Sequence, residues 1–277
     1  MDGFSSIAFI LLVANGYFSY RGITDNNFLE RYLFQVDKIL TGKEYYRMIS
    51  SGFVHGGWMH FGFNMITLFA FTPSLEAAIG IPLVLLIYFA SLIGGNLLAL
   101  FIHRNHPDYA AVGASGAVSG LIFSAIALFP GMRLGLLLLP FSMPAWLFGL
   151  LYMLYSIYGI RSKSDNIGHE AHLGGGLVGL VLSIILYPQA LFENTLPIVL
   201  IAIPASVFLF VIVTRPEFLI INSFTSRRHR NYTVEDRHNT SKISKEHELN
   251  RLLEKIHKKG MESLTEEEKQ RLKDLSG

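Results

Sequence analysis

The sequence predicts an all-α integral membrane protein. Of its 277 residues, 51% are hydrophobic and 16% are charged, and the mean hydropathy is +0.40. In an average soluble domain about a quarter of the residues are charged. The apolar residues also form runs of about 20, the length that a helix needs to cross the hydrocarbon core of a bilayer. These two observations place the chain in a lipid bilayer.

Seven stretches are long enough to span, some of them only as tilted helices. The first begins close to Met1. No basic segment precedes it and no small-residue cleavage site follows it, so we expect it to be retained as a span. The predicted spans are residues 4–20, 58–79, 82–102, 112–129, 145–160, 168–187 and 195–214.

Three other segments separate or follow these spans. The first loop, residues 21–57, is long, polar and aromatic, so we expect it to pack as a structured element at the membrane interface. Residues 131–144 are apolar but contain two prolines, which is typical of a re-entrant or interfacial lead-in to the fifth span. Residues 215–277 form a polar tail, in which we expect a helix over 244–259 and a second short helix begun by a capping box at Thr265. A solvated tail and a docking role both fit it, and its partner is unknown.

Composition excludes several kinds of chemistry. The chain has no cysteine, so disulfides, thiolate catalysis and cysteine-ligated metals are excluded. The net charge of +2 gives no reason to expect a nucleic-acid partner. We expect neither a metal nor another cofactor.

Two stretches of small residues carry groups that suit nucleophilic catalysis. Residues 113–120 read Gly-Ala-Ser-Gly-Ala-Val-Ser-Gly and open the fourth span, with glycines four residues apart that allow close helix packing. Residues 171–179 begin Ala-His-Leu-Gly-Gly and lie in the sixth span. Ser115 on one helix could therefore be a nucleophile, with His172 on the other as its base.

Polar side chains of three predicted spans share one depth. His60 and Asn64 lie near the start of the second span, Ser115 starts the fourth, and residues 169–172 start the sixth. Because alternate spans run in the same direction, all of these lie on one side of the membrane. Polar groups inside spans are costly and are therefore candidates for function. A lone His60 would more often be a satisfied core histidine, but its alignment with the others favours one polar pocket.

The spacing also suggests a role for each group. His60 and Asn64 are four residues apart and share a helix face, so both could donate to an oxyanion formed when Ser115 attacks a carbonyl. The backbone amide of Ser115 would add a third donor. Glu170 precedes His172 by two residues and would face away from it. The pattern therefore predicts a Ser–His dyad rather than a triad.

These motifs resemble those of the rhomboid family of intramembrane serine proteases. The family's GxSG, AHxGG and HxxxN patterns correspond to residues 113–116, 171–175 and 60–64. His55 lies five residues before His60, and Tyr46-Arg47 occupies the place of the family's Trp-Arg pair in the first loop. The resemblance covers about residues 40–190, in the order of the family.

The resemblance implies a fold and an activity. The implied fold is a six-helix protease core within residues 1–190, an additional transmembrane helix in 191–214 and a soluble tail in 215–277. The fifth helix and the loop after it would gate sideways entry of transmembrane protein substrates, in a bacterial cytoplasmic membrane. The implied catalytic residues are Ser115 and His172, the oxyanion donors are His60, Asn64 and Ser115, and the supporting residues are Gly113, Gly116, His55, Arg47 and Ser119.

The sequence departs from the family at Ser119, where many members carry an aromatic residue that stacks on the catalytic imidazole. The hydroxyl of Ser119 could orient His172 by a hydrogen bond, or it could bond back to its own helix.

The sequence leaves open which side of the membrane the predicted site faces. The family usually opens its site to the extracytoplasmic side, whereas the distribution of Lys and Arg places the same side in the cytoplasm.

Three other functions compete with a protease. A catalytically silent relative would bind transmembrane segments without cleaving them, although such a protein should lack the Ser or the His of the dyad. A metal-dependent membrane protein could use the histidines at 55, 60, 169 and 172, but the chain has no HExxH motif. A small transporter would need polar residues across the inner half of the spans, where Glu76 stands alone.

Overall fold

The computed structural model describes residues 5–135, 142–162, 167–214 and 265. All described helices and strands lie within Met1–Arg228. The predicted tail helices lie outside the described residues.

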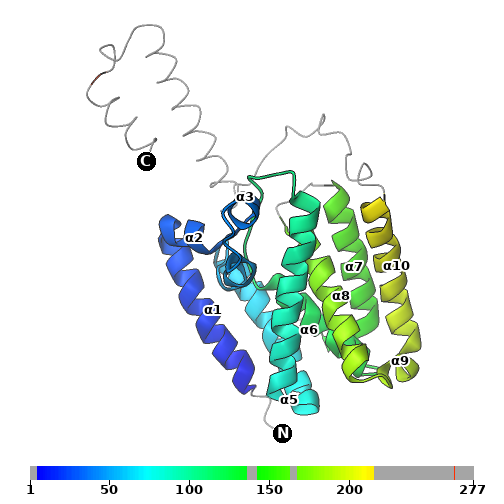
Figure 1. The fold of residues 1–277 in the computed structure, drawn as a ribbon. Coiled ribbons are helices and arrows are strands. Elements are labelled where there is room, and N and C mark those ends of the chain that lie inside the picture. Colours follow the sequence, from blue (N-terminus) through cyan, green and yellow to red (C-terminus); the bar gives the residue numbers. More distant parts are fainter. Residues whose placement is uncertain (1–4, 136–141, 163–166, 215–264, 266–277) are drawn as a thin grey trace. The chain divides into compact units, whose positions relative to one another are not determined.

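The described part of the chain is mostly helical, which confirms the all-α prediction (Figure 1). Four of its helices, α1, α5, α8 and α10, are long and apolar enough to cross a membrane, and α6 is a shorter apolar helix. The elements in order are α1 Ser6–Thr24, α2 Asn26–Tyr32, β1 Phe34–Gln35, α3 Val36–Leu40, α4 Arg47–Ser50, the 3-10 helix η1 Ser51–Phe53, α5 Trp58–His103, β2 Ala110–Ala111, α6 Ser115–Leu128, β3 Arg133–Gly135, β4 Ser142–Pro144, α7 Ala145–Ser162, α8 His169–Leu186, α9 Ala190–Glu193 and α10 Thr195–Thr214.

Helix α5 contains both the second and the third predicted span. Its backbone is helical on either side of Gly80, where φ is 77° and ψ is 161°. This left-handed conformation suits a residue without a Cβ atom. Pro82 follows two residues later, at the start of the second limb, where a missing N–H costs no hydrogen bond. Gly80 therefore ends one limb and Pro82 helps to start the next.

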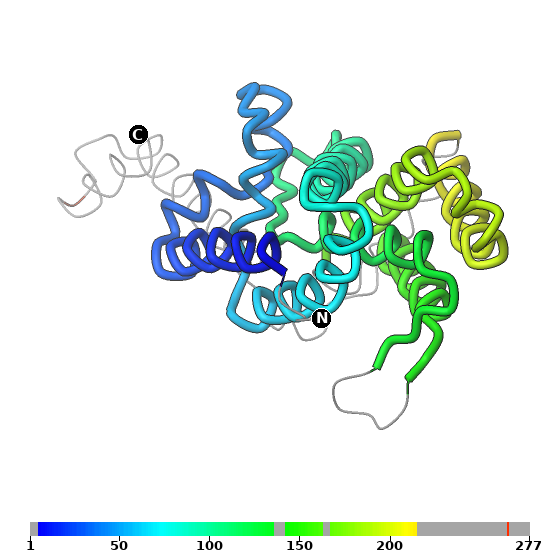
Figure 2. Tube along the Cα trace, turned by 90° about the horizontal axis from the view of Figure 1, so that it is seen from below, coloured from blue at the N-terminus to red at the C-terminus, as the bar shows by residue number. Residues whose placement is uncertain are grey.

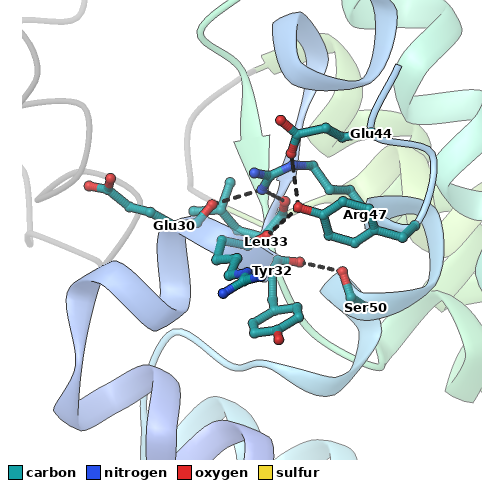
Figure 3. Close-up of polar contacts among 8 residues, drawn as sticks. Glu30, Tyr32, Leu33, Glu44, Arg47 and Ser50 are labelled. Carbon is teal, nitrogen blue, oxygen red and sulfur yellow. Dashed lines mark hydrogen bonds and ion pairs between the residues drawn. The ribbon is translucent and has the colours of Figure 1, made fainter. Parts of the chain in front are cut away.

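Residues 21–57 form the structured segment that the sequence predicts. Its central group is the guanidinium of Arg47, which is buried (Figure 3). Nε of Arg47 donates to Oε2 of Glu44 over 2.7 Å, and Nη1 donates to the carbonyl oxygens of Glu30 at 2.8 Å and Leu33 at 2.7 Å. The hydroxyl of Ser50 donates to the carbonyl of Tyr32 over 2.8 Å. These bonds tie α4 to the end of α2.

Helix α6 is the most buried of the described helices and packs against both α5 and α8, which also pack against each other. Twelve of its 14 residues are buried. Helices α1 and α10 lie at opposite ends of the row of helices in Figure 1. Both expose large apolar side chains, such as Ile10 and Phe210, as expected of helices that face lipid.

The lead-in to α7 contains two short strands, β3 and β4. The described residues form an antiparallel pair, which the sequence did not predict, in which Arg133 faces Pro144 and Gly135 faces Ser142, and the re-entrant or interfacial placement of the segment stays a prediction. This arm extends away from the helices in Figure 2. Nη2 of Arg133 donates to the carbonyl of Ser142 over 2.6 Å, and the bond reinforces the pair. Pro144 ends β4, and α7 begins at the next residue.

Candidate active site

Ser115 is the first residue of α6, and hydrogen bonds hold the loop before it. Gly113 has φ of +115°, a conformation that favours glycine. Its amide donates to the carbonyl of Ser51 over 2.9 Å. The amide of Ala114 donates to Nε2 of His55 over 3.4 Å. The amide of Ser115 comes next in the first turn of the helix, where N–H groups have no partner within the helix. The loop therefore places a hydroxyl and an N–H together at the start of α6.

His55 is part of a continuous chain of hydrogen bonds. Its Nε2 atom accepts from Ala114, so the proton lies on Nδ1, which donates to the Ser19 hydroxyl over 2.8 Å. That hydroxyl donates to the carbonyl of Phe53 over 3.1 Å. Burial, and then the neighbouring imidazole of His60, lower the pKa of His55 from 6.5 to about 3. His55 is therefore neutral at physiological pH and supports the loop that precedes Ser115.

The structure brings His60 against the same loop. A Cβ atom at Gly113 would lie 2.6 Å from both Cε1 and Nε2 of His60, so only a glycine leaves room for this ring. The rings of His55 and His60 meet edge to face, with centroids 5.0 Å apart. Asn64 is buried one turn further along, and its Nδ2 atom donates to the carbonyl of His60 over 3.0 Å. A primary amide has two hydrogens, and this bond uses one of them.

Helices α6 and α8 approach closely next to Ser115 and His172. A Cβ atom at Gly175 would lie 2.1 Å from the carbonyl oxygen of Gly116, and one at Gly116 would lie 3.2 Å from the carbonyl oxygen of Ala171. Gly116 follows Ser115, and Ala171 precedes His172. The contact between the two backbones therefore brings the N-terminal turns that carry these two residues together.

A chain of contacts through Tyr152 of α7 links the two predicted catalytic residues. The hydroxyl of Ser119 donates to the carbonyl of Ser115 over 2.7 Å and lies 2.8 Å from the hydroxyl of Tyr152. Because the hydrogen of Ser119 is used, Tyr152 is the donor of the second bond. The ring of Tyr152 stacks on the imidazole of His172, with centroids 5.5 Å apart and an angle of 23° between the planes. Ser119 thus bonds back to its own helix, the second of the two predicted alternatives.

Glu170 is directed away from His172. Its Oε1 atom lies 2.8 Å from Nε2 of His103 at the end of α5, and its Oε2 atom accepts from the Tyr109 hydroxyl over 3.4 Å. The ring of His103 is parallel to that of Tyr109, with centroids 3.5 Å apart. This buried cluster joins the start of α8 to the end of α5. Within residues 5–135, 142–162 and 167–214, no group of three or more His, Asp or Glu side chains is arranged to hold a metal ion.

The comparison with known families agrees with the motifs. The family model of the Rhomboid domain matches residues 42–189, which is more than half of the chain. The chain belongs to the rhomboid family. It is accordingly a multi-pass membrane protein. A second model, for a family of unknown function, matches residues 232–277.

The rhomboid chain resembles several curated proteins over this domain. It is 29% identical over 161 residues to "Rhomboid protein 1, mitochondrial" of Saccharomyces cerevisiae, covering 56% of this chain and 45% of the relative. It is 34% identical over 159 residues to "RHOMBOID-like protein 6, mitochondrial" of Arabidopsis thaliana, covering 55% and 47%. It is 28% identical over 162 residues to "Inactive rhomboid protein 1" of Drosophila melanogaster, covering 58% and 11%.

These relatives limit what similarity establishes. The rhomboid chain spans about half the length of the two mitochondrial relatives, and the relatives include an inactive protein. The mitochondrial relatives do not support the prediction of a bacterial cytoplasmic membrane.

Sequence reasoning missed Tyr152. Its signal was an aromatic series, Phe148, Tyr152 and Tyr155, at spacings of four and three residues within the predicted fifth span. The rings of Phe148 and Tyr152 are stacked 6.0 Å apart, and Tyr155 meets the ring of His169 edge to face at 4.9 Å. These spacings place the three aromatic side chains on one helix face. This face of α7 packs against α8.

Proposed function

We propose that this rhomboid protein is an intramembrane serine endopeptidase with Ser115 as nucleophile and His172 as general base. The observation that carries the proposal is the contact chain from the carbonyl of Ser115 through Ser119 and Tyr152 to the ring of His172. The close contact of α6 and α8 beside both residues supports it independently. These two separate features support the proposal that the hydroxyl of Ser115 and the imidazole of His172 act together.

The chemistry follows from these roles. Oγ of Ser115 attacks the carbonyl carbon of the scissile peptide bond, and its proton passes to His172. The C–N bond then breaks, His172 gives the proton to the leaving amine, and water cleaves the acyl-enzyme ester by the same route. His60, Asn64 and the amide of Ser115 donate hydrogen bonds to the oxyanion. Loss of one such donor typically lowers the rate by about 10²–10³-fold.

The substrate class follows from the membrane setting. We expect a transmembrane protein with a locally unwound segment, because a regular helix uses its carbonyls in its own hydrogen bonds. Counting the limbs of α5 separately and adding α6 and α7 to the long helices gives seven crossings. On this proposal residues 1–190 form the protease core, 191–214 an extra transmembrane helix, and 215–277 the soluble tail.

Covalent labelling of the serine tests the proposal. A fluorophosphonate probe should label the wild-type protein in detergent and in lipid vesicles, because an activated Ser115 displaces fluoride from phosphorus. Ser115→Ala and His172→Ala should abolish both labelling and cleavage of a reporter transmembrane helix. Ser124→Ala is the matched control, because Ser124 lies on the same helix and donates to the carbonyl of Gly179 over 3.1 Å, away from the site.

The outcomes separate protease from silent binder. Labelling of wild type and of Ser124→Ala, but of neither dyad variant, would support the dyad. Absence of labelling and cleavage in a folded wild-type protein that still binds transmembrane helices would favour the silent binder; the name of the Drosophila relative likewise describes an inactive protein. Cleavage by Ser115→Ala would refute the assignment of the nucleophile.

A further inference from the structure

We infer that Tyr152 is the positioning residue of the catalytic imidazole and that Ser119 acts through it. This inference rests on the proposed function. It assigns the orientation of His172, a residue of α8, to a side chain of the separate helix α7, which a hydrogen bond anchors to α6.

The first step of the argument concerns the stack. A ring that lies on the face of an imidazole restricts rotation about the Cβ–Cγ bond, because turning the imidazole would drive its edge into the neighbouring ring. The centroid separation of 5.5 Å and angle of 23° lie within the range of favourable aromatic pairs. Tyr152 also packs against Phe148, whose ring lies in a nearly parallel plane at 8° with its centroid 6.0 Å away. Tyr152 is therefore in contact with both Phe148 and His172, and its own ring is restricted by these neighbours.

The second step concerns the hydroxyl. The bond from Tyr152 to Ser119, and from Ser119 to the carbonyl of Ser115, fixes the tyrosine ring relative to the start of α6. The same tyrosine thus contacts the nucleophile's helix with its hydroxyl and the base's ring with its face. A change in either contact alters the geometry between Ser115 and His172. Misplacement of reacting groups by about 1 Å costs about 10²-fold in rate.

The third step concerns the attachment of α7. At Gly159, about two turns further along α7, a Cβ atom would lie 2.1 Å from Cδ2 of His169. Helix α7 therefore contacts α8 closely at two points, Gly159 against His169 and Tyr152 against His172. The contact of Gly159 with His169 fixes the position of Tyr152 along the axis of α8. This contact lies about two turns from Tyr152 along α7 and about one turn from His172 along α8.

Kinetics of Tyr152 and Ser119 variants test the inference. Tyr152→Leu should lower kcat by about 10–100-fold with little change in KM, because the ring touches the base and not the substrate. Tyr152→Phe keeps the stack and should lose only about 2–5-fold. Ser119→Ala should lose a similar factor, and the double variant Ser119→Ala/Tyr152→Phe should be no worse than either single variant within twofold. Tyr158→Leu, an exposed tyrosine on the same helix, is the matched control and should keep its kcat.

A second measurement does not need activity. The imidazole NMR signals of His172, assigned by their loss in His172→Ala, should shift in Tyr152→Leu because the ring current of the stacked tyrosine is removed. They should stay nearly unchanged in Tyr158→Leu. This readout separates failure of the inference from failure of the proposed protease function, since it holds in an inactive protein.

Three results would overturn the role of Tyr152, and a fourth would overturn that of Ser119. The first is a kcat of folded Tyr152→Leu within twofold of wild type, and the second is an effect of that variant on KM alone. The third is His172 signals that do not respond to Tyr152→Leu. If the two single losses multiply in the double variant, Ser119 does not act through Tyr152.

Discussion

Replacement of Gly175 by alanine tests the contact between α6 and α8 most directly. The added Cβ would lie 2.1 Å from the carbonyl oxygen of Gly116, and both atoms belong to helical backbones that cannot rotate aside. Restoring an ordinary contact of about 3.4 Å requires the helices to separate by roughly 1.3 Å at this point. The separation occurs next to Ser115 and three residues beyond His172.

Two effects on stability oppose each other in this variant. Overpacking costs about 1–3 kcal/mol, whereas alanine in place of glycine favours the helix by about 1 kcal/mol. The expected net loss of up to about 2 kcal/mol leaves most molecules folded. A separation of about 1 Å between the proposed nucleophile and base costs about 10²-fold in rate, which corresponds to about 2.8 kcal/mol in the barrier. Activity should therefore fall much further than the folded fraction.

The assay is cleavage of a reporter transmembrane helix in vesicles, normalised to folded protein from denaturant titration in detergent. Gly16→Ala on α1 is the control, because its Cβ would meet Phe61 at an ordinary distance of 3.7 Å. It should keep wild-type activity and be slightly stabilised. If folded Gly175→Ala retained activity within about threefold of wild type, the α6–α8 contact would not set the geometry of the site.

Two further predictions concern the supports of the site. His55 has a pKa of about 3 in the folded protein and 6.5 as its ordinary value, so the unfolded chain takes up a proton first as pH falls. The stability that the neutral His55 contributes is present above its ordinary pKa of 6.5 and is lost as the pH falls below it. The free energy of unfolding should therefore fall by about 2 kcal/mol between pH 7.5 and pH 5. His55→Asn should remove that part of the pH dependence in denaturant titrations, and an unchanged pH slope would contradict it. Arg47→Lys should lower the free energy of unfolding by about 2 kcal/mol, because an ammonium cannot reproduce the fork that binds Glu44, Glu30 and Leu33. An equal loss in the exposed Arg31→Lys would show that the fork is not the cause.

Hydropathy predicted the positions of the long helices well. The predicted spans 145–160 and 195–214 correspond to α7 Ala145–Ser162 and α10 Thr195–Thr214. Length and apolarity suffice here because the bilayer forces every spanning backbone into a helix. The polar residues near the starts of the second, fourth and sixth spans likewise lie near the starts of α5, α6 and α8.

The rotation of each helix about its axis was less predictable. Lipid-facing and protein-facing residues are both apolar, so periodicity does not show which side of α7 packs on α8. The sequence therefore did not show that Tyr152 faces His172, although it does show the aromatic residues around Tyr152. The β3–β4 pair escaped prediction for a different reason. Its strands, Arg-Leu-Gly at 133–135 and Ser-Met-Pro at 142–144, have three residues each, too few for an alternating pattern to show, and the prolines in an apolar segment suggested a re-entrant or interfacial lead-in.

The abrupt break at Gly80 has a consequence for the whole assembly. A long flexible turn would let the two limbs of α5 slide, but a break this short leaves no slack between them. One limb carries His60 and Asn64, while the other carries Asn96, whose amide donates to the carbonyl of Met48 over 2.8 Å in the first loop. One inserted residue would rotate a limb by about 100° and lift it by about 1.5 Å. A single glycine thus fixes the position of the proposed oxyanion donors relative to Asn96 and the first loop that it holds.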